Sequence, residues 1–374
     1  MDGVGLVAKN YAYWLNRRYG KGYVITPATP GYTYDDKIPV MRFFSLPIPK
    51  KHPYRFGVPW LDFSFRKAVR KIRFDIIHAH CPFVSGMVAL RIAKRHGIPL
   101  VASFHTKYHE DFKSIIRSKL ILNYLMKRIV RFYERADVVW VPNNATITTL
   151  REYGYKGDIE VMPNGTDITP PKDTDPLRES ANKEFRTTDK DFVMLFIGQM
   201  RWEKNLRLII DALGRLVERK RFKMIFVGEG PAMDEIQALV KKRGLVDHVR
   251  FLGVVRDRKR IESYYARADL FLFPSLYDTS PLVLREAAAF KLPLLFVEKA
   301  SAAEDVVDRK NGFLSANNVA AYADKILAIM KDKRTLAKAG TGARSSFYRT
   351  WEQTVDEVAQ RYRTIIEDYR RVHG

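Results

Sequence analysis

The sequence predicts an α/β protein of two domains, each built around a parallel β-sheet with helices on both faces. Two observations lead to this fold class. Short apolar runs rich in β-branched residues alternate with helix-length amphipathic stretches along almost the whole chain, which is the pattern of doubly covered parallel sheets. The chain of 374 residues is also longer than one hydrophobic core usually supports, because single cores stop growing near ~250–300 residues.

Ten runs have the composition and length of buried strands. They are Tyr23–Thr26, Asp75–His78, Leu100–Phe104, Val138–Val141 and Ile159–Met162 in the first half, and Val193–Ile197, Met224–Val227, Val249–Leu252, Leu270–Phe273 and Leu294–Val297 in the second. Helices are expected over 6–18, 84–96, 113–135, 203–219, 232–243, 259–267, 281–290 and 351–371. Because ligands of such sheets bind at the carboxyl ends of strands, functional residues are expected just after these runs.

A segment rich in Pro, Asn, Asp and Thr, residues 163–180, is typical of a linker and not of a regular element. It divides the chain into an N-terminal domain over residues 1–168 and a C-terminal domain over 169–350, followed by a helix over 351–374. A Rossmann domain opens with a strand before its first glycine loop, but here the glycines at 3 and 5 follow the chain start directly. We expect that the first strand is missing because the chain is part of a longer reading frame. The alternative is an N-terminal sheet that is built differently.

The net charge of +23 is concentrated in the N-terminal part, where residues 1–170 hold 27 Lys and Arg against 13 Asp and Glu. Such a field attracts nucleic acid, anionic lipid surfaces or phosphorylated substrates. No nucleic-acid-binding module is recognisable, so no nucleic-acid partner is expected. The single cysteine, Cys81, cannot form an internal disulfide, and no apolar run is long enough to span a bilayer. A cytoplasmic location is therefore expected.

The most informative segment is PSLYDTSPLVLREAAAF, residues 274–290, in which a polar loop joins a buried strand to a helix. Asp278 lies in the loop and Glu286 lies one to two turns into the helix, with seven residues between them. The helix N-terminus favours an anionic ligand, and the two carboxylates suit the hydroxyl groups of a sugar and a ribose. Taken alone, the pair is more typical of a helix cap and an exposed helix acid.

This segment resembles the acid-x7-acid signature of glycosyltransferase family four, whose members have the GT-B fold of two Rossmann-like domains facing across a cleft. The resemblance implies that Asp278 contacts hydroxyls of the donor sugar and that Glu286 binds the ribose of the nucleotide. In the family the first acid is usually Glu, and a Phe-Gly pair stands where this chain has Ser280-Pro281. Pro281 has no N–H to offer the donor. The implied donor contacts in this segment also include Thr279, Ser280 and Leu282.

Residues 197–213, IGQMRWEKNLRLIIDAL, resemble the family's glycine turn with its Arg and Lys. The turn falls on Gly198 and the family's Lys falls on Lys204, while Gln199 occupies the Arg position. Fixed cations stabilise the negative charge that develops on a departing nucleotide diphosphate. The resemblance therefore implies that Lys204 is catalytic and that Arg201 reaches in as the second cation. The competing interpretation is an ordinary basic helix start.

Weaker matches follow in the family's order. They are FVGEGP (226–231), FLG (251–253) with Gly253, YARADLFLFPS (265–275) and NGF (311–313). Asp2-Gly3-Val4-Gly5 resembles the family's glycine loop, which implies that Gly3 and Gly5 face the donor phosphates. FHTKY (104–108) matches the place of the family's active-site His, which implies that His105 contacts sugar and acceptor. PNGTD (163–167) resembles the entrance to the linker, and the helix from Trp351 resembles the C-terminal helix that crosses back onto the first domain.

Three other patterns imitate metal sites. His78 and His80 share one face of a strand beside Cys81, but convergent ligands are not evident elsewhere, and histidines near an acceptor pocket are the simpler interpretation. The segments 173–175 (DTD) and 189–191 (DKD) imitate the metal-binding DxD of the other glycosyltransferase fold, but both lie in the linker region and are interpreted as solvated turns. Neither a metal nor a cofactor is therefore expected.

Together these features predict a retaining, metal-independent hexosyltransferase. Its donor is expected to be a nucleotide-diphosphate sugar, UDP-glucose first and GDP-mannose second. The resemblance implies a same-face mechanism, because no carboxylate is placed as an obvious covalent nucleophile. Gln199 and Ser280-Pro281 keep an alternative open, in which the chain is a catalytically degenerate partner or carbohydrate-binding subunit.

The acceptor is expected to be a lipid or glycan, with the protein peripheral on the inner face of an anionic membrane. Residues 113–135 carry seven basic residues and one acid among apolar ones, and residues 49–74 mix aromatics with another basic run. This combination suits a helix at a lipid surface. The competing interpretation is an ordinary cover helix, with its apolar stripe on the sheet and its charges in water.

Overall fold

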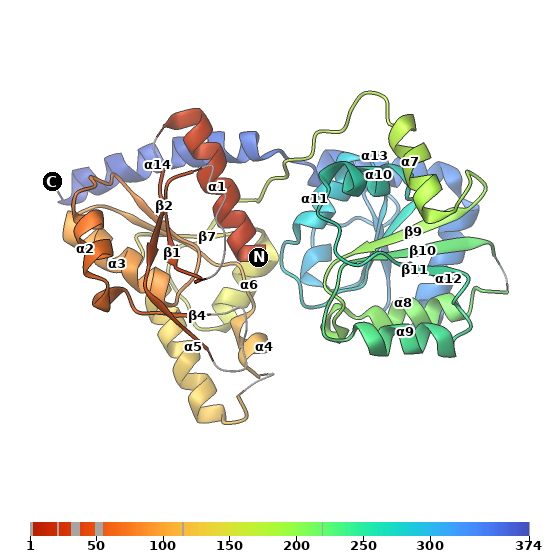
Figure 1. Ribbon diagram of the computed structural model, residues 1–374, viewed down its shortest axis with the longest axis horizontal. Coiled ribbons are helices and arrows are strands. Elements are labelled where there is room, and N and C mark those ends of the chain that lie inside the picture. The colour runs from red at the N-terminus through yellow and green to blue at the C-terminus, as the bar shows by residue number, and fades with distance from the viewer. Residues whose placement is uncertain are drawn as a thin grey trace. The chain divides into compact units, whose positions relative to one another are not determined.

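Figure 1 shows the computed structural model of the chain, which describes residues 3–20, 22–30, 38–48, 55–113, 116–218 and 220–373. The chain divides into an N-terminal unit, Met1–Asn164 with Trp351–Gly374, and a C-terminal unit, Gly165–Thr350. The boundary falls inside the segment 163–180, which is rich in Pro, Asp and Thr. Parallel sheets and helices build both units, so the predicted α/β class is confirmed.

The C-terminal unit contains a six-stranded parallel sheet in the order β11-β10-β9-β12-β13-β14. The strands are β9 (Phe192–Ile197), β10 (Phe222–Val227), β11 (Val249–Phe251), β12 (Leu270–Phe273), β13 (Leu294–Val297) and β14 (Phe313–Ser315). Strand order runs outward from β9 on one side and from β12 on the other, so it reverses between these two neighbours. In open parallel sheets, ligands bind beyond the carboxyl ends of the strands at such a switch point.

Alternate residues of these strands enter two separate buried layers. Met194 and Phe196 pack with helices α8 (Leu206–Gly214), α9 (Met233–Lys242) and α12 (Val319–Lys331). Val193 and Leu195 pack with α7 (Asp175–Phe185), α10 (Arg258–Arg267), α11 (Leu282–Ala289) and α13 (Lys333–Phe347). Figure 1 shows α8 and α9 on one face of the sheet and α7 and α10 on the other. Because both faces are covered, the strands are continuous apolar runs.

The N-terminal unit contains a four-stranded parallel sheet in the order β5 (Ile77–Ala79), β6 (Leu100–Ser103), β7 (Val138–Val141) and β8 (Glu160–Val161). Helices α3 (Val84–His96), α4 (Tyr108–Lys113), α5 (Lys119–Tyr133) and α6 (Asn144–Glu152) connect these strands. Earlier in the chain, β1 (Val24–Pro27) pairs in parallel with β2 (Val40–Phe43), and β3 (Ser45–Pro47) pairs antiparallel with β4 (Arg55–Gly57). The short helices η1 (Pro59–Leu61) and α2 (Phe63–Arg70) follow.

The first and last helices of the chain, α1 (Gly3–Tyr19) and α14 (Trp351–His373), pack together in the N-terminal unit. The guanidinium of Arg18 donates to both carboxylate oxygens of Asp356, at 2.7 and 3.0 Å. Tyr362 of α14 stacks on Trp140 of β7 with ring centroids 5.5 Å apart. Within the described residues α1 is the first element, and no strand precedes it. None of the described helices combines the length and the apolar composition needed to cross a bilayer.

All ten predicted strands are present, with ends shifted by at most two residues. The described elements that the sequence did not predict are β2, β3, β4, β14, α2, α4, α6, α7, α12, α13 and the short helices η1 and η3 (Ser301–Ala303). Helix α13 illustrates the reason, because Gly340 and Gly342 interrupt its helical pattern. A Cβ at Gly340 would lie 2.0 Å from the Lys291 carbonyl oxygen, so these glycines allow close backbone packing and do not break the helix.

Two predicted elements are wrong. The segment 163–180 is not a linker throughout, because α7 begins at Asp175 with a proline in its first turn, where the missing N–H needs no partner. The pattern over 113–135 is not one helix, because α4 ends at Lys113 and α5 begins at Lys119. Ser118 caps α5, with its hydroxyl oxygen accepting from the backbone N–H of Ile121 at 3.5 Å. Residues 114 and 115 lie outside the described residues.

Candidate active site

Three glycine turns meet at the carboxyl ends of β9, β10 and β11. Gly228 has a φ of 129°, and its N–H donates to the Gly253 carbonyl oxygen at 2.7 Å. A Cβ at Gly228 would lie 2.0 Å from the carbonyl oxygen of Gly198, so only glycine fits. Gly253 itself has a φ of 63°. This packing accounts for the glycine at 228. The contact of Gly198 and Gly253 with the donor stays a prediction.

Lys204 ends the short helix η2 (Trp202–Lys204), which follows β9. The next residue, Asn205, has a φ of 59° and donates from Nδ2 to the Pro274 carbonyl oxygen at 3.2 Å and to Asn317 Oδ1 at 2.9 Å. The loop after β9 is thereby tied to the loop after β12. This tie lies at the switch point, and it holds Lys204 beside the loop that carries Asp278.

Asp278 forms an ion pair with Lys204. The two side chains are 14% and 18% exposed, so the pair is largely shielded from water. Ser275 Oγ, which is buried, accepts from the backbone N–H groups of Tyr277 and Asp278, both at 3.3 Å, and so shapes the loop. The second carboxylate oxygen of Asp278, Oδ2, is buried and has no hydrogen-bond partner in the described part of the chain.

Glu286 is the fifth residue of α11 and is 9% exposed. Its Oε1 accepts from both terminal nitrogens of Arg258 at 3.0 and 3.1 Å, and its Oε2 accepts from the Tyr265 hydroxyl at 2.7 Å. Burial and the carboxylate together raise the pKa of Tyr265 well above its usual range. Arg258 also pairs with Asp167. The Glu286 carboxylate is therefore buried and fixed in orientation.

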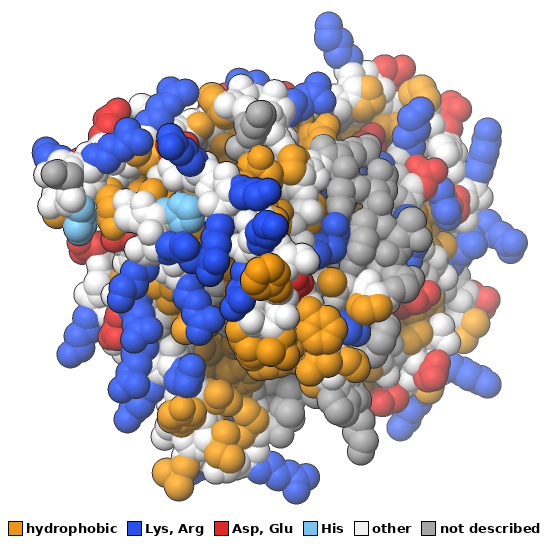
Figure 2. Space-filling model, turned by 60° about the vertical axis from the view of Figure 1, so that its left-hand side comes forward, with side chains coloured by type: hydrophobic (Ala, Val, Ile, Leu, Met, Phe, Trp, Pro, Cys, Tyr) orange, Lys and Arg blue, Asp and Glu red, His pale blue; other side chains and the backbone are white. Residues whose placement is uncertain are grey.

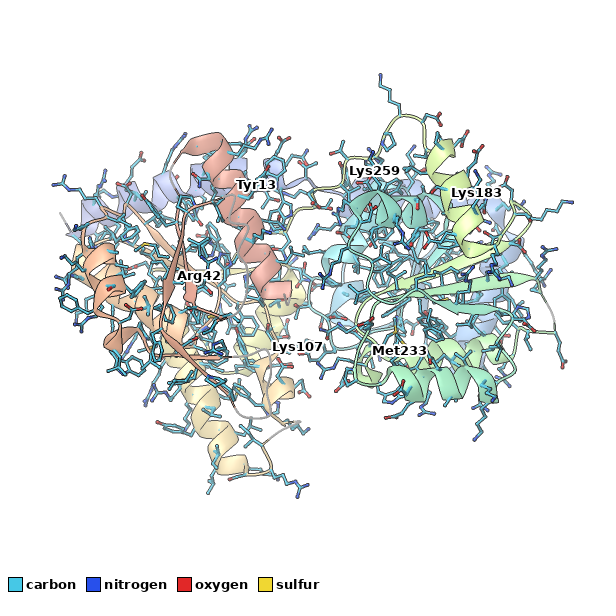
Figure 3. The ribbon with its side chains drawn as sticks, viewed as in Figure 1. Tyr13, Arg42, Lys107, Lys183, Met233 and Lys259 are labelled. Atoms are coloured by element: carbon cyan, nitrogen blue, oxygen red, sulfur yellow. The ribbon has the colours of Figure 1, made fainter. Side chains whose placement is uncertain are left out.

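Sequence reasoning missed Arg258 and Tyr265. They are seven residues apart on α10, which places both on one face of that helix. This spacing was visible in the sequence, but no pattern indicates that α10 packs beside α11. Figure 3 labels Lys259, the residue after Arg258, at the start of α10.

The remaining candidates of the C-terminal unit are less buried. Arg201 is 45% exposed and its guanidinium lies 3.5 Å from Glu203 Oε1, so it is not paired with Asp278. Pro281 caps α11 with a φ of −70°. Thr279 and Ser280 lie between Asp278 and α11, and Leu282 is the first residue of α11; all three are half-buried. Their predicted roles toward the donor stay predictions.

In the N-terminal unit, His105 follows β6 and His80 follows β5. His105 Nε2 lies 3.0 Å from His80 Nδ1, and burial lowers the pKa of His105 to about 4. His78 is held differently, with Nδ1 2.5 Å from the Tyr362 hydroxyl and Nε2 2.7 Å from Ser103 Oγ. These histidines are neutral hydrogen-bonding groups near neutral pH. No cluster of three or more His, Cys, Asp or Glu side chains suited to a metal occurs among the described residues. Figure 3 labels Lys107, two residues beyond His105.

Two sequence interpretations are corrected. Gly3 and Gly5 do not form a loop, because α1 begins at Gly3 and both belong to its first turn, while Asp2 lies outside the described residues. The segment 189–191 is a solvated turn only in part. Residues 189 and 190 are exposed and lie in a turn, whereas Asp191 is 4% exposed and accepts from the N–H and hydroxyl of Thr188 at 2.8 and 3.0 Å. In the segment 173–175, Asp173 Oδ1 accepts from the N–H of Asp175 at 2.9 Å, just where α7 begins.

Comparison with known proteins identifies relatives along the whole chain. The profile of the family described as glycosyl transferases group 1 matches residues 178–346, and that of glycosyltransferase family 4 matches residues 1–169. Alpha-monoglucosyldiacylglycerol synthase of Acholeplasma laidlawii is 23% identical over 308 residues, which cover 79% of this chain and 77% of the relative. The protein of the same name from Streptococcus pneumoniae is 25% identical over 268 residues, which cover 69% of this chain and 58% of the relative.

Among solved structures, Anabaena HepE in complex with UDP-glucose matches with a TM-score of 0.73 and 21% identity, covering 96% of each chain. The shared fold is GT-B, with two Rossmann-like domains, as the resemblance implied. The two family profiles together span both units. The chain therefore belongs to glycosyltransferase family four and is a GT-B glycosyltransferase.

Proposed function

We propose that this chain transfers a hexose, with retention of configuration and without a divalent metal, from a nucleotide-diphosphate sugar to a lipid or glycan. The observation that carries the proposal is the convergence of Lys204 and Asp278 at the switch point between β9 and β12. Glu286 is fixed nearby on α11, the helix that follows the Asp278 loop. The fold is similar to that of HepE, which was solved with UDP-glucose, so UDP-glucose is the first donor to test and GDP-mannose the second.

Each side chain has a distinct task in this proposal. The bond between the sugar's C1 and the diphosphate oxygen breaks, and the ammonium of Lys204 stabilises the charge that develops on the leaving group. Arg201 is the second cation, and Asp278 accepts hydrogen bonds from sugar hydroxyls. Glu286 accepts from ribose hydroxyls in the orientation that Arg258 fixes. The acceptor hydroxyl bonds to C1 on the face that the diphosphate leaves, and its proton passes to the departing diphosphate.

Two relatives support a lipid acceptor, because both are named for a glucosylated diacylglycerol. The N-terminal unit carries surface features that suit a membrane. Leu120, Ile121 and Tyr124 of α5 are 82%, 54% and 57% exposed. Exposed large apolar side chains also lie on or beside β3, β4 and η1, and they are Phe44, Leu46, Ile48, Phe56, Trp60, Leu61 and Phe63. Figure 2 shows hydrophobic side chains gathered beside a dense field of Lys and Arg.

Helix α5 has both buried and exposed apolar side chains. Leu122, Met126 and Ile129 pack into the core of the N-terminal unit, as in an ordinary cover helix. The apolar side chains of Leu120, Ile121 and Tyr124, at the start of α5, stay exposed. Lys127 and Arg128 are also exposed and lie one turn after Tyr124. We propose that this apolar start and its flanking cations rest on the cytoplasmic face of an anionic membrane.

The donor proposal is tested with a panel of nucleotide sugars in EDTA, read by thermal shift and by release of nucleotide diphosphate. A donor at 100 times its dissociation constant should stabilise the protein by about 2.7 kcal/mol. Glu286→Ala should abolish this stabilisation, because the ribose hydroxyls lose their acceptor. Asp211→Asn is the matched control, since Asp211 pairs with Arg243 at 2.8 Å on α8. The proposal fails if no donor stabilises the protein or if turnover requires Mn²⁺ or Mg²⁺. Binding without turnover on any acceptor would favour the partner-subunit alternative.

The membrane proposal is tested by sedimentation with vesicles. Binding to vesicles that contain acidic phospholipid should be strong at low salt and weaken as salt rises, while neutral vesicles are ignored. Reversing Lys127, Arg128 and Arg131 to Glu should remove this binding and leave donor binding intact. Reversing three exposed lysines of the C-terminal unit, at 331, 333 and 338, changes the net charge equally and should preserve it. If the wild-type protein ignores acidic vesicles at low salt, a soluble acceptor becomes the better assignment.

A further inference from the structure

The two side chains that we assign to opposite parts of the donor also bind each other. Lys204 and Asp278 form an ion pair in which both side chains are more than four-fifths buried. In the described part of the chain, Lys204 is the one cation within 4.0 Å of Asp278. We propose that this pair makes the site discriminate between the complete nucleotide sugar and the nucleotide diphosphate left after transfer. The inference rests on the proposed function and concerns the same site.

A diphosphate that approaches Lys204 must compete with Asp278, because the Asp278 carboxylate is already paired with the Lys204 ammonium. Either Lys204 leaves Asp278, whose carboxylate is then buried without a cation, or two anions share one cation at close range. Both arrangements weaken binding, because an uncompensated buried charge is strongly unfavourable.

A nucleotide sugar differs in that it brings its own hydroxyl donors next to the diphosphate. These hydroxyls can replace Lys204 as partners of the Asp278 carboxylate. They can also satisfy Oδ2, which is buried and has no partner among the described residues. The complete donor therefore compensates Asp278, whereas the free nucleotide diphosphate does not. Asp278 should for this reason favour loading of donor and release of the diphosphate product.

The test measures binding of UDP and UDP-glucose by calorimetry, in EDTA and without acceptor. The wild-type protein should bind UDP-glucose at least about tenfold more tightly than UDP. Asp278→Asn should bind UDP about tenfold more tightly than the wild type and lose the preference for UDP-glucose. Asp278→Ser removes the same charge without adding an amide and should behave alike. Asp211→Asn, in which a 16% exposed carboxylate paired with Arg243 is neutralised, should leave both affinities unchanged.

A double variant separates the pair from general electrostatics. In a Lys204→Met background, Asp278→Asn should no longer tighten UDP binding, because the competition for the ammonium has gone. The inference is overturned if Asp278→Asn and Asp278→Ser leave UDP affinity unchanged or weaken it, or if Asp211→Asn tightens UDP equally. If the wild-type protein binds neither nucleotide, the donor proposal itself fails. If it binds both and the variants do not alter their ratio, only the discrimination fails.

Discussion

Replacing Arg258 with Met removes the cation that holds Glu286 while keeping a similar apolar stem. Arg258 donates two hydrogen bonds to Glu286 Oε1, at 3.0 and 3.1 Å, and Glu286 is 9% exposed. Hydrogen bonds to a charged group contribute about 1.5–3 kcal/mol each when buried. The Arg258 side chain is 40% exposed, so water replaces part of what is lost. We expect the unfolding free energy to fall by about 1–2 kcal/mol.

The functional effect should be separate from this loss of stability. Without Arg258, the Tyr265 hydroxyl is the remaining partner described for the carboxylate, and Glu286 is free to rotate away from the ribose. We expect the donor KM to rise about tenfold, equivalent to about 1.4 kcal/mol, with a smaller change in kcat. Initial rates at varied UDP-glucose concentration measure both constants, and thermal unfolding measures stability.

Arg260→Met is the matched control. Arg260 lies two residues further along α10, is 49% exposed, and pairs with Glu184 at 2.5 Å outside the site. Both variants lose one positive charge from the same helix. Arg258→Met loses the ion pairs with Glu286 and Asp167, and Arg260→Met loses the ion pair with Glu184, so both should lose stability. Only Arg258→Met should raise the donor KM. An unchanged KM in Arg258→Met, or an equal rise in Arg260→Met, would refute the positioning role.

Two further predictions concern the other cation and the buried histidines. Arg201→Ala should lower turnover by roughly a hundredfold, the scale of losing one electrostatic stabiliser, and an unchanged rate would assign Arg201 to its exposed contact with Glu203. Burial lowers the pKa of His105 to about 4, below the unfolded value of about 6.5. The unfolded chain therefore binds the proton more readily, and stability present above pH 6.5 is lost as pH falls toward 4. Denaturation at pH 7.5 and pH 5 should show that His105→Gln reduces this loss by about 2 kcal/mol. An identical loss in the variant would contradict this prediction.

The parts of the fold that could be predicted are those whose signal is local. Val138–Val141 and Leu270–Phe273 are short apolar runs, each preceded by Asp and followed by Pro. Each is a strand with the predicted bounds. The positions of Lys204 and Asp278 could also be predicted, because both residues follow closely after predicted strands. Because carboxyl ends of parallel strands share one edge of the sheet, strand order alone brings such residues together.

What could not be predicted depends on packing between segments distant in sequence. Arg258 orients Glu286 only because α10 lies beside α11, and no local pattern encodes that neighbourhood. Asp191 looked like a surface turn, since its burial depends on Arg221, thirty residues away, and on Thr188. Gly340 and Gly342 of α13 lie against the backbone carbonyl groups of Lys291 and Lys310, and no local pattern predicts these contacts. In each case a residue's neighbours in space, and not in sequence, decide its role.

The most direct test of the account is the configuration of the product. The protein is incubated with UDP-glucose and EDTA in the presence of vesicles of diacylglycerol and anionic phospholipid. The anomeric signal of the glycolipid product is then read by NMR. If transfer is retaining and independent of metal, UDP should be released and an α-linked glucoside should form without added metal. A β-linked product, or product formed only when Mn²⁺ or Mg²⁺ is supplied, would contradict it.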